Sequence, residues 1–159
     1  MDRIVFEPAK ENELNKILDI QKKAFEQLFI KYQDLETSPY NEDIETILFR
    51  FNMEGSFYFF IMDNNKKIGF IRVVFDKTNK KARVSPIAIL PDYENKGYGK
   101  CSMIAIEQKF SEVKEWDLDT ITQENKLVNF YLKLGYKILP KSKKIKEGMT
   151  ITFFKKIVI

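Results

Sequence analysis

The chain has 159 residues, a length that fits one domain and is short for two. It contains no histidine and a single cysteine, which excludes a Ser-His-Asp or Cys-His hydrolase in its usual form, a histidine- or thiolate-based zinc site and an intrachain disulfide. The formal net charge of +4 comes from lysines spread along the chain, which indicates either a solvated lysine-rich surface or an anionic partner, and not nucleic acid.

Hydrophobic periodicity predicts the elements of the first half of the chain. Apolar residues at three- and four-residue spacing indicate helices over 11–32 and 42–52, joined by a loop over 34–41. Apolar runs bounded by turn residues predict strands, in chain order, at 3–7, 57–62, 67–75 and 82–90.

Pro86 interrupts the last of these strands. Proline has no N–H to donate to a neighbouring strand, so a central strand rarely contains it. Either the strand begins after Pro86, or it is bulged or unpaired on one side at this residue. The sequence leaves both alternatives open.

The second half of the chain alternates helices and strands. We expect helices over 100–113 and 124–134, and strands, in chain order, at 116–122, 136–139 and 149–158, the last two around a lysine-rich turn. In the strand over 116–122, Trp116 and Leu118 fall on one face and Asp117 and Asp119 on the other. The element order predicts one mixed α/β domain over 1–159, with a mostly antiparallel sheet and a βαβ-like crossover in the middle.

The stretch over 87–100 carries the clearest chemical signal. A buried strand ends, Gly97-Tyr98-Gly99 follows, and a helix begins at once. A helix start presents unpaired N–H groups and the positive end of a dipole, and Lys96 and Lys100 add charge beside it, which favours phosphate or diphosphate binding. A purely structural turn is the alternative. The Rossmann and Walker patterns are not met, because the third glycine of the first and the Gly-Lys-Ser/Thr of the second are missing.

Two motifs resemble those of the GNAT N-acetyltransferase family. The run Pro-Asp-Tyr-Glu-Asn-Lys-Gly-Tyr-Gly-Lys at 91–100 is similar to the coenzyme A loop of that family, and Phe-Tyr-Leu-Lys-Leu-Gly-Tyr at 130–136 resembles its helix ending in Tyr-x-Lys-x-Gly-Phe/Tyr. The motif separation and the element order of the whole chain match as well. The resemblance implies the acyl-CoA N-acyltransferase fold: a mixed, mostly antiparallel sheet of about seven strands, splayed at the cofactor site and flanked by about four helices.

The resemblance also implies a reaction and its residues. An amine on a small molecule, peptide or protein would attack the thioester of acetyl-CoA directly, without a metal, and Tyr131 would protonate the departing thiolate; Tyr131 as a plain core residue is the alternative. Pantetheine would pair with the backbone of Ile87, Ala88 and Ile89. The diphosphate would bind the loop N–H groups of Asn95, Lys96, Gly97, Tyr98, Gly99 and Lys100. The family's helix asparagine falls on Glu124, and Asn125 is one residue later, so either the helix start is shifted by one and Asn125 replaces it, or that contact is lost.

Two further departures from the family pattern concern charge. Glu94 stands where the family has Gln or Arg, and Arg83 stands where some members place a glutamate base. The remaining proton acceptors are Asp117, Asp119 and Glu124, each of which is alternatively a solvated carboxylate. The loop between the first two helices is expected to shape the acceptor site, with candidate walls and acidic groups at Phe29, Tyr32, Tyr40, Asp34, Glu36, Glu42 and Asp43.

A non-catalytic module that binds coenzyme A or a nucleotide on the same fold is the alternative function. We expect a cytoplasmic protein that binds no membrane, because the first residues lack the apolar core of a signal peptide and the longest apolar run, 57–62, is too short to span a bilayer. The apolar stretch at 151–159 is a candidate pairing strand for a homodimer, an arrangement common in the family.

Overall fold

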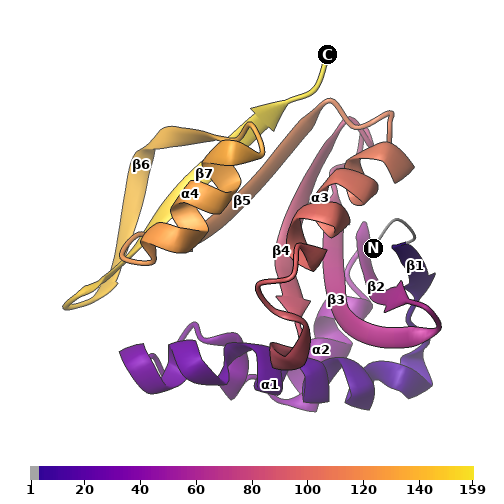
Figure 1. The fold of residues 1–159 in the computed structure, drawn as a ribbon, viewed down its shortest axis with the longest axis horizontal. Helices are drawn as coiled ribbons and strands as arrows, with labels where there is room; N and C mark the ends of the chain where they lie inside the picture. Colours follow the sequence, from indigo (N-terminus) through magenta and orange to yellow (C-terminus); the bar gives the residue numbers. More distant parts are fainter. Residues whose placement is uncertain (1–3) are drawn as a thin grey trace.

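The computed structural model describes residues 4–159, which form a seven-stranded sheet and four α-helices (Figure 1). Arg3, the first residue of the expected opening strand, lies outside the described residues. Short 3₁₀ turns occupy 11–13, 39–41 and 91–93. The elements are β1 (Val5–Pro8), α1 (Leu14–Tyr32), α2 (Ile44–Phe51), β2 (Ser56–Asp63), β3 (Lys66–Phe75), β4 (Lys81–Ile89), α3 (Tyr98–Lys109), β5 (Glu115–Ile121), α4 (Asn125–Lys133), β6 (Lys137–Lys146) and β7 (Met149–Ile157).

The strand order in the sheet is β1-β2-β3-β4-β5-β7-β6. Every neighbouring pair is antiparallel except β4 and β5, which are parallel and are joined through α3. This arrangement confirms the expected mixed, mostly antiparallel sheet with a βαβ crossover in its middle.

Both faces of the sheet carry a core, because side chains alternate along each strand. On one face, Phe59 and Ile61 of β2 pack with residues of α3, β5 and α4, among them Met103, Trp116 and Tyr131. On the other face, Tyr58 and Phe60 of the same strand pack with α1 and α2, through Leu14, Ile17, Ile20 and Ile47. The helices thus lie on opposite sides, α1 and α2 on one and α3 and α4 on the other.

The sheet divides between β4 and β5. These strands pair only at their first residues, where Lys81 lies opposite Glu115 and Arg83 opposite Asp117. Beyond that point they separate, and Figure 1 shows α1 running across the end where they are farthest apart. We call this divergence, bounded by β4 and α3 on one side and by β5 and α4 on the other, the splay. It confirms the expected splayed sheet.

Pro86 lies within β4, so the strand does not begin after it. The β3–β4 register changes here: Val73 faces Val84 while Ile71 faces Ile87, which leaves one extra residue on β4. Arg72, buried opposite this bulge, donates to the carbonyl oxygen of Ser85 at 3.1 Å. The bulge and the absence of a β5 partner along 84–89 together explain how a central strand accommodates a proline.

Two features of the C-terminal strands differ from the sequence expectations. The lysine-rich segment after Leu139 is not a turn, because β6 continues to Lys146 and pairs with β7 up to a tight turn at Gly148. β6 is an edge strand, and its lysines place charge there, which discourages pairing with another chain. β7 itself pairs with β5 on one side and, as far as Lys155, with β6 on the other, so most of the stretch expected to support a homodimer contact has no free edge.

Candidate active site

The loop before α3 leaves a row of backbone donors unused. Within residues 4–159, no acceptor meets hydrogen-bond geometry for the six consecutive N–H groups from Asn95 to Lys100; the next one, of Cys101, donates to the carbonyl oxygen of Gly97 at 3.1 Å. These donors lie at the positive end of the α3 dipole. Lys96 and Lys100 are exposed beside them. The arrangement has the donors and the charge that a diphosphate needs.

The loop conformation depends on left-handed residues. Asn95 has φ 60° and Gly97, the N-cap of α3, has φ 88°. A Cβ is disfavoured at such a φ, which explains the glycine at 97. Gly99 differs, because its φ is not left-handed and an added Cβ would lie 3.4 Å from the ring of Phe130 in α4, an ordinary contact.

β4 presents peptide groups to the splay at alternate residues. The N–H of Leu90 donates to the carbonyl oxygen of Ile68 in β3 at 2.9 Å. Because successive peptide groups of a strand point to opposite sides, those of Ile87 and Ile89 face the splay. The carbonyl of Ala88 instead faces β3, where a Cβ on Gly69 would lie 2.1 Å from it. This differs from the expectation that all three residues could pair with pantetheine.

Tyr131 is buried in α4, 7% exposed, with its ring against Tyr136 and Phe154. Its hydroxyl has no hydrogen-bond partner among residues 4–159, yet it is not one of the fully enclosed polar atoms, unlike the hydroxyl of Tyr136. Burial, and to a smaller degree the charge of Asp119, raises the pKa of Tyr131 well above its ordinary value. The hydroxyl therefore stays protonated at neutral pH.

Arg83 links β4 to β5 where the two strands still pair. Its guanidinium forms ion pairs with both Asp117 and Asp119 of β5. Two of the three proton acceptors expected from the sequence are thus neutralised by the residue that stands where some family members have a glutamate. The sequence alone could not indicate this pairing, because Arg83 and the aspartates are brought together only by the parallel β4–β5 register.

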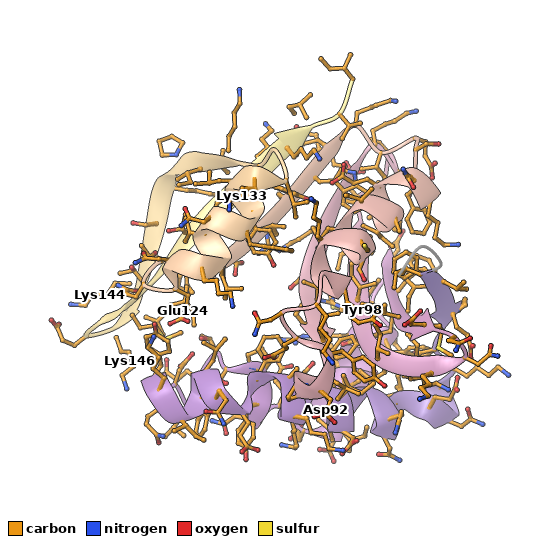
Figure 2. All side chains as sticks on the ribbon, in the orientation of Figure 1. Asp92, Tyr98, Glu124, Lys133, Lys144 and Lys146 are labelled. Carbon is orange, nitrogen blue, oxygen red and sulfur yellow. The ribbon has the colours of Figure 1, made fainter. Side chains whose placement is uncertain are left out.

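Glu124, the third expected acceptor, is the N-cap residue of α4 and links it to α1. Its Oε2 accepts hydrogen bonds from the Tyr32 hydroxyl at 2.5 Å and from Lys31 Nζ at 2.6 Å. Figure 2 shows Glu124 at the start of α4, near the end of α1. Asn125 follows it as the exposed first residue of the helix.

Lys126 is a site residue that the sequence reasoning missed. Its ammonium, in the first turn of α4, donates to the side-chain oxygen of Asn95 across the splay. The charge therefore lies beside the free N–H groups of the loop. In the sequence, Lys126 is one lysine among many, 31 residues from Asn95, and no local pattern marks it.

Most of the acceptor-loop residues have structural partners. Phe29 and Tyr40 stack with ring centroids 4.9 Å apart. The carboxylate of Asp34 is held by Thr37 and its own turn, and Asp43 caps α2 through the N–H of Thr46 at 2.9 Å. Glu42 pairs with Arg50 at 2.6 Å. Glu36, exposed, keeps no such partner among the described residues.

Within residues 4–159, none of the helices combines the length and the apolar character needed to cross a bilayer. The same part of the chain brings together no group of three or more acidic, histidine or cysteine side chains suited to a metal ion.

Comparisons with known proteins agree with this architecture. The ribosomal-protein-S18-alanine N-acetyltransferase from Escherichia coli superimposes with a TM-score of 0.77 at 15% identity, over 98% of this chain and 94% of that one. A PaiA N-acetyltransferase from Thermoplasma acidophilum in complex with coenzyme A gives 0.71 at 15% identity, over 98% and 99%. A mutant of the spermidine N-acetyltransferase from Vibrio cholerae gives 0.74 at 13% identity, over 99% and 95%.

In sequence, no curated protein matches the chain. The model of the Acetyltransferase (GNAT) family matches residues 14–136, which contain the loop, the splay and all of α4. The chain belongs to the GNAT acetyltransferase family.

Proposed function

We propose that the protein transfers an acetyl group from acetyl-CoA to an amine of a small molecule, peptide or protein. The observation that carries this proposal is the row of six free N–H groups from Asn95 to Lys100, placed where β4 and β5 separate. A diphosphate on this row would direct its pantetheine arm along the exposed peptide groups of Ile87 and Ile89. Lys126 would add a charge from the opposite side of the splay.

Acetyl-CoA supplies the activated acyl group, and the chain's residues supply position and a proton. The amine nitrogen attacks the thioester carbon, the carbon–sulfur bond breaks, and in the net reaction one proton moves from nitrogen to sulfur. Tyr131, protonated at neutral pH, would give its proton to the leaving sulfur, and the proton that the amine nitrogen releases would restore the Tyr131 hydroxyl. Its hydroxyl has no partner among residues 4–159 that would compete for that proton.

An assay of thioester cleavage tests the proposal. Purified protein is titrated with coenzyme A to measure saturable binding, and release of free thiol from acetyl-CoA is then followed over a panel of primary amines. We expect saturable binding and amine-dependent thiol release. Binding without turnover for every amine would favour a non-catalytic coenzyme A module, and no saturable binding would overturn both functions.

A further inference from the structure

The junction between the end of α1 and the start of α4 already holds two ammonium groups of the chain. Lys31 Nζ lies 2.6 Å from Glu124 Oε2, and Lys146, from the β6–β7 hairpin, donates to the carbonyl oxygen of Tyr32 at 2.8 Å. Figure 2 shows Glu124 and Lys146 close to the same end of α1. Two cations from distant parts of the sequence thus gather at one place, which we call the cation junction.

Two features make the cation junction attractive to positive charge. The last carbonyl groups of α1 are the negative end of its dipole. The Glu124 side chain is only 19% exposed, so its charge is poorly screened by water. Burial alone would raise the pKa of Glu124, but the hydrogen bonds from Lys31 and Tyr32 lower it below its ordinary value. The carboxylate is therefore ionised at neutral pH and bound to a cation.

The partner of Glu124 is easily exchanged. The Lys31 side chain is 58% exposed and extends from the last turn of α1. An incoming ammonium group that replaces Lys31 keeps the charge contact to Glu124, and the Lys31 ammonium, which is already largely exposed, returns to water. Asp117 and Asp119 differ, because both are held by the single planar guanidinium of Arg83 at the base of the splay.

Glu124 and Tyr131 belong to the same segment, because Glu124 is the N-cap of α4 and Tyr131 lies near the end of that helix. The seven residues that separate them correspond to about 10 Å along the helix axis, at about 1.5 Å per residue. An acceptor that reacts beside Tyr131 would need about this length to place a second group on Glu124.

We propose that Glu124 binds a second cationic group of the acceptor and that Lys31 occupies this place until the acceptor displaces it. The acceptor class is then a di- or polyamine. Its primary amine reacts beside Tyr131, and its remote ammonium replaces Lys31 Nζ on Glu124. This inference rests on the proposed acetyl transfer to an amine.

The test compares α,ω-diaminoalkanes of increasing length with 1-aminoalkanes of the same lengths, using the whole chain and acetyl-CoA. The readout is the ratio of kcat/KM for the diamine to that for the monoamine. We expect the ratio to peak at one length, and Glu124→Gln to lower the peak by about tenfold, the loss expected for a charge-assisted hydrogen bond. Lys31→Gln should raise the ratio, because it removes the competing ammonium. Lys133→Gln, on an exposed part of α4, is the matched control.

The two variants also distinguish a binding site from a structural link. If Lys31 only fastens α1 to α4, Lys31→Gln lowers the ratio or leaves it unchanged, and the inference is wrong. A Glu124→Gln variant with an unaltered ratio contradicts it equally. Calorimetric titration measures diamine binding without turnover. Binding that depends on Glu124 but is not followed by thiol release would overturn only the proposed function. Thiol release without a preference for diamines would overturn only this inference.

Discussion

Lys126 in the first turn of α4 donates a hydrogen bond to the side-chain oxygen of Asn95, in the loop that precedes α3. The bond crosses the splay and joins two segments whose strands have already separated. It places an ammonium group next to the free N–H groups of Asn95 to Lys100.

We expect Lys126→Gln to weaken coenzyme A binding by about three- to tenfold, the range of a partly exposed charge contact to phosphate. Binding should also become less sensitive to salt, because one phosphate contact is lost. Titrations at two ionic strengths measure both effects. Lys133→Gln, near the other end of the same helix, should change neither, and equal losses in the two variants would mean that only net charge matters.

Tyr131→Phe should lower the rate of thiol release by about a hundredfold or more, the range for loss of a positioned general acid. The affinity for coenzyme A should stay within about twofold of that of the unaltered protein. The core packing against Tyr136 and Phe154 is kept, because the ring is unchanged. Stopped-flow or steady-state thiol detection gives the rate. A variant with full activity would show that Tyr131 is only a core residue.

Tyr136→Phe is the matched control for that variant. The Tyr136 hydroxyl is fully enclosed and has no hydrogen-bond partner among residues 4–159. Removing a buried group that makes no bond should leave thiol release unchanged and raise the free energy of unfolding by up to about 1 kcal/mol. Denaturant titration measures this change, and a marked loss of stability would reveal a partner that the structure does not contain.

The two glycines of the loop should respond differently to alanine. Gly97→Ala places a Cβ on a residue with φ 88°, at a cost of about 1–2 kcal/mol, and should weaken coenzyme A binding by distorting the row of N–H groups. Gly99→Ala only brings a Cβ into ordinary contact with Phe130, so we expect a smaller effect on both quantities. Thermal unfolding and coenzyme A titration of the two variants measure the changes in stability and in affinity. Equal changes in the two variants would contradict the explanation by the left-handed φ of Gly97.

Acid should weaken the link between α1 and α4. The pKa of Glu124 is lowered in the folded protein, so its contribution to stability is present above the ordinary glutamate pKa of about 4.3 and is lost as the pH falls through the lower folded value. Unfolding followed from about pH 6 to about pH 3 should therefore lose less stability in Glu124→Gln than in the original chain. The same slope in both proteins would show that Glu124 does not contribute.

Local patterns predicted much of the fold. The apolar spacing over 11–32 and 42–52 corresponds to α1 and α2, and alternation at Trp116 and Leu118 gives the buried face of β5. The sequence pattern wrongly predicts a turn at the lysine-rich end of β6. An exposed edge strand has no buried face that would impose an alternation of apolar residues. Pro86 stayed ambiguous, since only the neighbouring strands decide whether its missing N–H matters.

The sequence by itself determined the strand–loop–helix with Gly97 and the helix bearing Tyr131, because glycine conformation, dipoles and periodicity are properties of adjacent residues. Tertiary structure alone decided which charges meet: Lys126 with Asn95, Lys31 with Glu124, and Arg83 with its two aspartates. Such partners lie far apart in the chain, and a flexible charged side chain carries no local sign of the group that the fold will place beside it.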